Sequence, residues 1–343
     1  MIVGMTVGPV EKTLAVAYFL PVMVIGISGN SWVIVTLIRI LYKTWSPMNS
    51  VFKHMSLYIL SLSIADMCVL CMTPSVTSYF ILGSWELGYV GCKIFFAVEN
   101  INKLLSVAIL AVMSFERFLV ICRPFQWFCC RRKRVSNVFT VVIILLAAIG
   151  ALCSPIIYYA KTSVVQDYYN PGVNITTCSS DLPDDVMSVF IMYMFILGFV
   201  LPVLFISTCY YFLIRHLRNK DGKSMFVTSY TTRVVRSILT VVLFHFACWT
   251  PFWVFVVVPM LSYFGIVEFT FLESDYSQKI RMFSSFLPYL NSAGNWIFYS
   301  RAITHASSAL VSKPYRRVAE PRPERRGMLL KTFGSTFTNN TKV

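Results

Sequence analysis

The sequence predicts an all-α membrane protein, a bundle of seven transmembrane helices with the N-terminus outside the cell and the C-terminus inside. Composition is the first reason: 57% of the 343 residues are hydrophobic and 13% are charged, whereas about a quarter of an average soluble domain is charged. The second reason is length, since a helix needs about 20 apolar residues to cross a bilayer. Seven stretches qualify, at residues 13–41, 50–80, 89–122, 135–160, 186–218, 228–262 and 277–300.

The distribution of basic residues orients the predicted bundle. Lys and Arg accumulate on the cytoplasmic side of membrane proteins, and here they crowd the connections after the first, third and fifth spans and the region beyond residue 300. The opposite connections carry most of the acidic residues, which would attract a cationic ligand. The net charge of +15 therefore indicates contact with anionic membrane lipids and cytosolic partners, and argues against nucleic-acid binding.

Three segments follow from this topology. Residues 1–12 form a short extracellular N-terminal segment, residues 13–300 form the seven-transmembrane bundle, and residues 301–343 form a cytoplasmic tail. The tail is expected to be mostly disordered because it is rich in Ser, Pro and Arg and has little apolar periodicity. A cleaved signal peptide is not predicted, because the first apolar run is too long and continues as a span.

Only two of the ten cysteines are predicted to face the outside. Cys92 opens the third span, and Cys178 lies midway along the connection between the fourth and fifth spans. Disulfides persist in oxidising compartments, so we predict a bridge that fastens this connection over the mouth of the bundle; the alternative is a pair of free thiols. Asn174, followed by Ile175 and Thr176, is a glycosylation sequon on the same side.

Charged residues within or at the ends of the spans are the strongest functional signal. An ionised side chain in hydrocarbon costs several kcal/mol unless it is paired or hydrated, so such residues are candidates for a functional site. The candidates are Asp66, Glu99, Lys103, Glu116 and Arg117.

Asp66 has polar neighbours available on two other spans. Asn102 and Ser106 are four residues apart in the third span, and Asn291 and Asn295 are four apart in the seventh, so each pair shares one helix face. Oxygen ligands of this kind suit a small hard cation. One interpretation is therefore a sodium site, and the other is a hydrogen-bonded polar core that holds no ion.

The triplet Glu116-Arg117-Phe118 at the end of the third span resembles the Asp-Arg-Tyr triplet of rhodopsin-like (class A) G-protein-coupled receptors. Other positions match the same family pattern in order and on the corresponding spans, from about residue 15 to residue 300. The resemblance implies a multi-pass receptor of the plasma membrane that activates a heterotrimeric G protein, with the inhibitory class as one candidate. The further matches are Asn30, Asp66, Cys92 with Cys178, Pro202 with Tyr210, Cys248-Trp249-Thr250-Pro251 and, less completely, residues 291–299.

Within that family the chain is most similar to the somatostatin, opioid and allatostatin-C group of peptide receptors, through Pro74, Glu99 with Asn102, and Tyr289. Glu99 occupies the place of that group's ligand-binding Asp. The resemblance therefore implies a carboxylate that meets a ligand cation, with Tyr289 as its hydrogen-bonding neighbour. Lys103 follows Glu99 by four residues, in the order that favours an intrahelical ion pair, so the alternative is a structural pair in which Glu99 is already neutralised.

The sixth span is expected to be the moving element. Trp249 precedes Thr250-Pro251, and a proline inside a helix removes a backbone hydrogen bond and introduces a kink. The resemblance implies that Trp249 forms the floor of the ligand pocket and that outward movement of this span opens the cytoplasmic side; the alternative is an aromatic packing residue beside a kink. The implied ligand-binding residues are Glu99, Lys103, Trp249, Trp253 and Tyr289, and the implied coupling residues are Glu116, Arg117, Tyr210, Trp249, Pro251, Asn295 and Tyr299.

Two departures from the family pattern concern the sixth and seventh spans. Trp296 stands where the family has a Pro, so the seventh span should be straighter there, and Pro288 is the position that would carry the bend instead. His245 replaces a family Phe one turn before Trp249, which places a titratable group at the switch region. The alternative to a proton-sensing role is a hydrogen-bonded core histidine.

The primary functional hypothesis is a receptor for an extracellular, cationic neuropeptide. A biogenic amine is the alternative ligand, although Lys103 would lie beside its positive charge. An ion-coupled transporter is the alternative from another class, but the sequence shows no inverted repeat. An intramembrane enzyme would need an acid pair or a nucleophile with its base. No Gly-x-Ser-x-Gly run occurs, so we predict no enzymatic activity, no catalytic residues and no cofactor apart from the sodium ion.

Overall fold

The computed structural model describes residues 8–43, 50–122, 134–166, 172, 174–218, 225–265 and 274–311. The chain divides into two units, Met1–Thr304 and His305–Val343, and the first holds the helical bundle. The elements are α1 (Pro9–Lys43), α2 (Ser50–Leu82), α3 (Gly88–Cys122), α5 (Arg134–Tyr158), β1 (Ala160–Gln166), β2 (Asn174–Ser180), α6 (Asp184–Phe195), η2 (Ile196–Val200), α7 (Leu201–Arg218), α8 (Met225–Tyr263), α9 (Asp275–Ser284) and α10 (Leu287–Val311).

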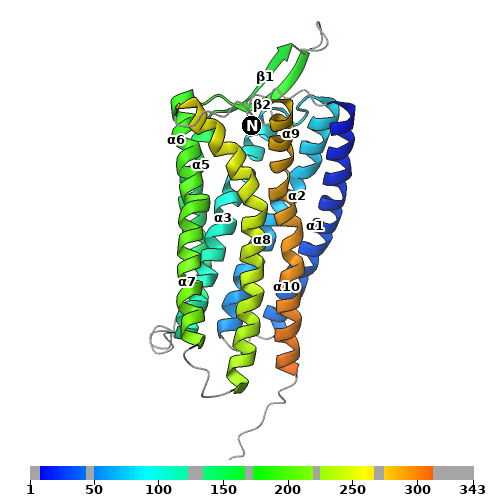
Figure 1. Ribbon diagram of the computed structural model, residues 1–343. Helices are drawn as coiled ribbons and strands as arrows, with labels where there is room; N and C mark the ends of the chain where they lie inside the picture. The colour runs from blue at the N-terminus through cyan, green and yellow to red at the C-terminus, as the bar shows by residue number, and fades with distance from the viewer. Residues whose placement is uncertain are drawn as a thin grey trace, which may run out of the picture. The chain divides into compact units, whose positions relative to one another are not determined.

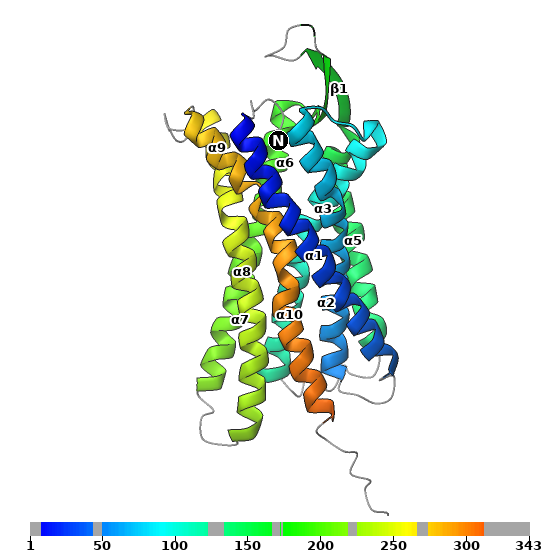
Figure 2. The same ribbon diagram turned by 90° about the vertical axis from the view of Figure 1, so that its right-hand side faces the viewer.

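Long helices that lie side by side form the first unit (Figures 1 and 2). α3 is central to it, because it contacts α2, α5, α7 and α8 as well as both strands. Six segments of the described chain are long and apolar enough to cross a bilayer: α1, α2, α3, α5, the run from α6 to α7, and α8. The seventh span is divided into α9 and α10, and α10 is less apolar because it carries Asn291, Ser292 and Asn295. The predicted seven-helix fold is confirmed.

The helices at the two ends of the predicted bundle are longer than the sequence pattern indicates. α1 begins at Pro9, inside the expected N-terminal segment, and α10 continues to Val311, inside the expected tail. The remainder of the predicted tail, like the basic connections at 123–133 and 219–224, lies outside the described residues.

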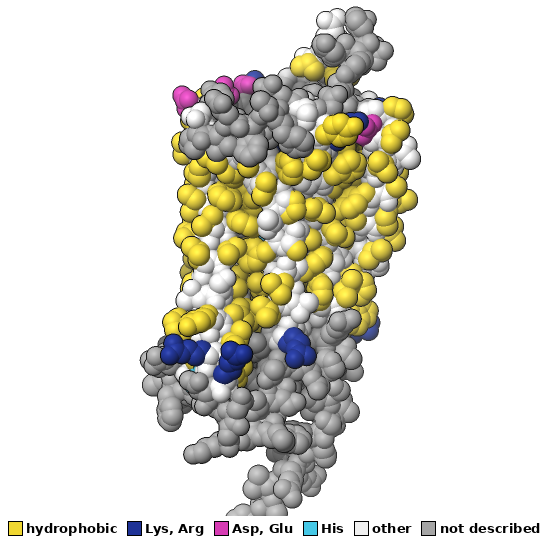
Figure 3. Space-filling model, viewed as in Figure 1, with side chains coloured by type: hydrophobic (Ala, Val, Ile, Leu, Met, Phe, Trp, Pro, Cys, Tyr) yellow, Lys and Arg dark blue, Asp and Glu magenta, His cyan; other side chains and the backbone are white. Residues whose placement is uncertain are grey.

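An apolar belt covers the face of the molecule shown in Figure 3. Hydrophobic side chains occupy its middle, Lys and Arg gather at one edge, and acidic side chains lie at the other. The basic edge is the end where α7 finishes, with Arg215 and Arg218 in its last turn. The β-hairpin lies at the opposite end (Figure 1). By the rule that places basic residues in the cytoplasm, the hairpin is on the extracellular side.

The connection between α5 and α6 forms an antiparallel β-hairpin, β1 with β2, which the sequence pattern did not predict. Two hydrogen bonds anchor the hairpin to the turn between α2 and α3. The backbone N–H of Trp85 donates to the Thr176 carbonyl at 2.7 Å, and the Thr176 N–H donates to Ser84 Oγ at 3.1 Å. The outer edge of β2 is thus tied to the bundle.

A disulfide between Cys92 and Cys178 fastens β2 to the start of α3, as the cysteine positions predict. Cys178 lies opposite Thr162 in the hairpin, so the bridge restrains both strands. The predicted glycosylation site, Asn174, is exposed at the beginning of β2, at the same end of the molecule as the disulfide.

The seventh span is interrupted at Ser285 and Phe286, between α9 and α10. Pro288 follows as the second residue of α10, where a missing backbone N–H removes no intrahelical hydrogen bond. The Tyr18 hydroxyl of α1 donates to the Phe286 carbonyl at 2.8 Å and so satisfies an acceptor beside the interruption. α10 then passes through Trp296 as one helix, so the distortion lies at Pro288 and not at Trp296.

Trp296 packs closely against α1 at Gly29. A Cβ atom built on Gly29 would lie 2.3 Å from three atoms of the Trp296 indole ring, which is far inside van der Waals contact. The absence of a side chain at Gly29 is therefore what gives the indole its place between α1 and α10.

We expect Gly29→Ala to destabilise the purified protein by about 1–3 kcal/mol, the usual cost of overpacking, because the new methyl group must displace the indole. Thermal unfolding in detergent measures the change. Gly150→Ala in α5 is the matched control, since a Cβ there meets no atom within 4 Å and Ala is preferred to Gly inside a helix. Trp296→Leu should restore stability to the Gly29→Ala protein, and a further loss instead would mean that this contact is not the cause.

A π-helical segment, η2, connects α6 to α7, and Pro202 is the second residue of α7. Proline cannot donate a hydrogen bond to the preceding turn, which accounts for the irregular geometry at this point. Gly198 within η2 lets two neighbours approach, since a Cβ there would lie 3.0 Å from the Leu104 side chain and 3.4 Å from the Trp253 ring. The fifth span is thereby brought against Trp253 of α8.

Candidate ligand-binding site

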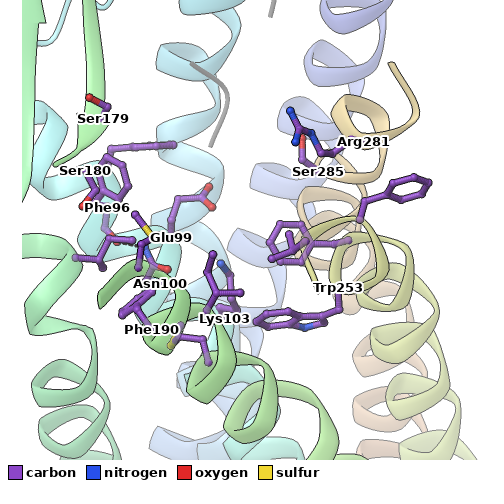
Figure 4. Close-up of a pocket in the computed structure, with 18 of the residues that line it drawn as sticks. Phe96, Glu99, Asn100, Lys103, Ser179, Ser180, Phe190, Trp253, Arg281 and Ser285 are labelled. Carbon is purple, nitrogen blue, oxygen red and sulfur yellow. Dashed lines mark hydrogen bonds between the residues drawn. The ribbon is translucent and has the colours of Figure 1, made fainter. Parts of the chain in front are cut away.

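A cavity of about 760 Å³ lies at the extracellular end of the bundle, between α2, α3, α6, α8, α9 and α10 (Figure 4). Its volume falls in the range of about 300–1,000 Å³ that is usual for ligand sites. β2 contributes Cys178 to Ser180 to its lining, so the disulfide also positions part of the cavity wall. Most of the other lining residues are aromatic or aliphatic, and the charged ones are Glu99, Lys103, Asp184 and Arg281.

Glu99 and Tyr289 meet in this cavity as the resemblance predicts. The Tyr289 hydroxyl donates a hydrogen bond to Glu99 Oε1, which joins α10 to α3. The Tyr289 side chain is 5% exposed, and its ring packs edge-on against Phe19 with a centroid distance of 5.3 Å. Phe80 and Phe286 belong to the same buried cluster. This aromatic core holds the Tyr289 hydroxyl in place beside Glu99 Oε1.

Lys103 lies one turn deeper on α3 and faces aromatic rings of α8. Its Nζ is 4.9 Å from the ring centroid of Phe252, 5.8 Å from that of Trp253 and 5.9 Å from that of Trp249, distances at which a cation is attracted to a ring face. The salt bridges between described residues include none that joins Lys103 to Glu99. The two charges attract each other across one helical turn without forming a direct ion pair.

Trp253 lines the cavity, whereas Trp249 lies beneath it and is not part of the lining. The Trp249 ring packs edge-on against Phe252 at 5.4 Å and lies 5.9 Å from the His245 ring. Trp249 and His245 are buried, at 5% and 1% exposure. Of the five residues predicted to bind the ligand, four therefore share one cavity, and Trp249 supports the aromatic side chains that form its floor.

The predicted polar set is buried in the middle of the bundle and is divided into two hydrogen-bonded pairs. Asn295 Nδ2 donates to Asp66 Oδ2 at 3.0 Å, and Ser106 Oγ donates to Asn102 Oδ1 at 3.2 Å. Several oxygen atoms of the set are buried and lack a hydrogen-bond partner within the described residues. These atoms are Asp66 Oδ1, Asn291 Oδ1 and Asn295 Oδ1.

Glu116 at the cytoplasmic end of α3 has two neighbours on α2 that the sequence pattern did not reveal. Its Oε1 lies 3.5 Å from His54 Nδ1 and accepts a hydrogen bond of 3.4 Å from the Tyr58 hydroxyl. His54 and Tyr58 are four residues apart and so share a helix face, and His54 is a polar residue in an apolar span. That spacing is the signal that was open to sequence reasoning.

Three further residues that were predicted to take part in coupling are buried. Arg117 is 8% exposed, Tyr210 is 6% exposed and Tyr299 is 2% exposed. Pro251 lies within α8, which continues past it to Tyr263. A cytoplasmic partner would therefore reach Arg117, Tyr210 and Tyr299 only after the bundle opens.

Residues 29–299 match the family model described as seven-transmembrane receptors of the rhodopsin family. The chain belongs to this family. It is 30% identical to a probable G-protein coupled receptor of Caenorhabditis elegans, over 83% of this chain and 65% of that protein. It is 27% identical to neuropeptide receptor 18 of Caenorhabditis elegans, over 83% and 62%, and 28% identical to somatostatin receptor type 5 of Bos taurus, over 82% and 70%. The chain thus matches slightly less than two thirds of the length of the two nematode relatives.

Family membership confirms the predicted resemblance to rhodopsin-like receptors, and the somatostatin receptors are among the relatives. The protein is accordingly a multi-pass protein of the plasma membrane, and its family consists of receptors rather than enzymes.

Proposed function

We propose that this protein is a receptor for an extracellular peptide and signals through a heterotrimeric G protein. The observation that carries the proposal is the cavity in which Glu99, held by Tyr289, lies beside Lys103 and Trp253. Its volume of about 760 Å³ accommodates a few residues of a peptide, and the Glu99 carboxylate offers a partner for a ligand cation. Relatives that are named as neuropeptide and somatostatin receptors support a peptide ligand.

The proposed mechanism is a shift between two packings of the bundle. A ligand favours one packing only by the difference in its affinity for the two. Trp253 on the cavity wall and Trp249 beneath it flank Pro251, so contacts at Trp253 act next to the proline in α8. Outward movement of α8 then exposes Arg117, Tyr210 and Tyr299 to the G protein, with Glu116 released from its contacts on α2.

A neuropeptide library screened against the expressed protein, with a promiscuous G-protein readout, tests this function. At least one peptide is expected to produce a signal at concentrations where biogenic amines do not. A fall in cyclic AMP without the promiscuous G protein would identify the inhibitory class as the partner. Activation by amines alone would contradict the peptide assignment, and ion currents or substrate turnover by the purified protein without a G protein would contradict the receptor mechanism.

We also propose that the Asp66 set binds an allosteric sodium ion. Asp66 Oδ1, Asn291 Oδ1 and Asn295 Oδ1 are buried oxygen atoms that make no close hydrogen bond among the described residues, with Ser292 near Asp66 and His245 near Asn291 as their polar neighbours, and unpaired buried acceptors are costly. Carboxylate and amide oxygens fit a hard cation. Asn102 and Ser106, on the facing helix α3, supply further oxygens.

Asp66→Asn is expected to abolish the stabilisation of the purified protein by sodium chloride over N-methylglucamine chloride. A ligand that binds only the folded state raises the free energy of unfolding by about 2.7 kcal/mol when its concentration is 100 times its Kd. Thermal unfolding detects a change of this size. Asp184→Asn, at an exposed position on the cavity rim, should keep the sodium effect. A sodium effect of equal size in the Asp66→Asn protein would exclude this site.

A further inference from the structure

The ammonium group of Lys103 is placed differently from the other lysines near the extracellular end. Each of those has an oxygen acceptor at hydrogen-bond distance, whereas Lys103 has, among the described residues, three aromatic rings of α8 around it and a longer-range attraction to Glu99. The lysines with acceptors are Lys12 on the Ile81 carbonyl at 3.0 Å, Lys93 on the carbonyls of Ile157 and Tyr158 at 3.0 and 2.7 Å, Lys161 on Asp181, and Lys279 on Glu11 at 2.9 Å.

The nearest carboxylate does not complete the surroundings of Lys103. Glu99 is on the preceding turn of α3 and attracts the ammonium group electrostatically, but its Oε1 is hydrogen-bonded to Tyr289 and no ion pair joins it to Lys103. In Figure 4 the Lys103 side chain extends toward Trp253, below Glu99, while Arg281 lies near the cavity entrance. Asp184, the other acid of the lining, is exposed in the first turn of α6.

An ammonium group in such a place is only partly compensated. Contact with ring faces attracts a cation, but a charge removed from bulk water is best stabilised by an opposite charge with hydrogen bonds. Lys103 lines the cavity, so a ligand in the cavity can supply the missing acceptor.

We propose that Lys103 is the anchor of an anionic subsite that binds a carboxylate of the peptide ligand, next to the cationic subsite at Glu99. This inference rests on the proposed function of the cavity. Glu99 and Lys103 are one turn apart on α3 and line the same cavity, so the ligand presents a basic group and a carboxylate close enough together to reach both side chains. A free C-terminus preceded by a basic residue, or an acidic side chain next to one, supplies this pair.

The test combines receptor variants with matched peptides. Every peptide that activates the wild-type protein in the library screen is resynthesised with an amidated C-terminus, and separately with each Asp changed to Asn and each Glu to Gln. One of these peptide changes is expected to reduce potency at the wild-type receptor by at least about tenfold. The same change should have no further effect at the Lys103→Gln receptor, because the effects of removing the two partners of one contact are not additive. The peptide change that behaves in this way identifies the C-terminus or a side chain as the source.

Lys103→Arg keeps the charge, so the unmodified peptide is expected to retain its potency at this variant within about threefold. Arg281→Gln removes a positive charge at the cavity entrance and is the matched control, at which neutralising the peptide should still reduce potency. Surface expression is measured for each variant, and Lys103→Met, which keeps the apolar stem of the side chain, replaces Lys103→Gln if that protein does not reach the surface. Equal losses for each neutralised peptide at the wild-type and Lys103→Gln receptors, or no loss with any of them, would overturn the anionic subsite alone. Failure of all peptides at the wild-type receptor would overturn the proposed function and this inference with it.

Discussion

Glu99→Gln is expected to raise the concentration of a peptide agonist needed for half-maximal signalling by about 10- to 100-fold, with surface expression unchanged. Glutamine has the size of glutamate and still accepts the hydrogen bond from Tyr289, so the packing of α3 against α10 persists and only the charge is lost. A hydrogen bond to a charged group contributes about 1.5–3 kcal/mol, and each 1.4 kcal/mol is about a factor of ten. Dose–response curves of G-protein activation measure the change.

Asp184→Asn removes the same charge from the rim of the same cavity and serves as the control. Asp184 is exposed in the first turn of α6, where water and salt screen its field, so the change in potency should stay below about threefold. Equal losses in the two variants would indicate general electrostatic attraction instead of contact at Glu99. Unchanged potency of Glu99→Gln would remove Glu99 from the ligand site.

Loss of the Cys92 to Cys178 disulfide is expected to destabilise the protein by about 2–5 kcal/mol and to remove most of the response to peptide. The bridge spans a sequence separation of 86 residues, and the β2 residues around Cys178 form part of the cavity wall. Without it, the hairpin is held mainly by its hydrogen bonds to the turn at Ser84 and Trp85. Thermal unfolding of Cys92→Ser measures the first effect and dose–response curves of G-protein activation measure the second, with cell-surface labelling as the check on expression.

Cys92→Ser, Cys178→Ser and the double replacement should give the same loss, because each breaks the same bond. Cys68→Ser is the control, since Cys68 is an exposed free cysteine of α2. Losses that add in the double variant would show that the serines, and not the missing bridge, cause the damage.

Elements whose determinants are local were predicted well from the sequence. The length of the apolar stretches locates the helices, because a membrane span must satisfy its backbone hydrogen bonds internally. The topology that follows places only Cys92 and Cys178, of the ten cysteines, on the extracellular side. The β-hairpin was missed because its residues, such as Lys161 and Thr176, have no clear apolar alternation; the strands are fixed by the disulfide and by hydrogen bonds to Trp85.

The candidate site shows the limit of local information more clearly. The spacing of Glu99 and Lys103 allows an ion pair along one helix, and the sequence offers no means to choose between that pair and a ligand contact. The choice depends on Tyr289 and Phe252, which lie 190 and 149 positions along the chain from Glu99 and Lys103. In the same way, the contacts of Glu116 with His54 and Tyr58 depend on how α2 packs on α3.

The amino-acid sequence by itself determined that this protein crosses the membrane seven times, which side each connection faces, and which charged residues the hydrocarbon would have to tolerate, because hydropathy and charge act on each segment separately. Only the tertiary structure decided which partner each buried charge has, that Trp249 lies below the cavity while Trp253 lines it, and that Trp296 fits against Gly29. These are contacts between helices, and the free energy of a buried polar or aromatic group depends on the atoms that other segments place around it.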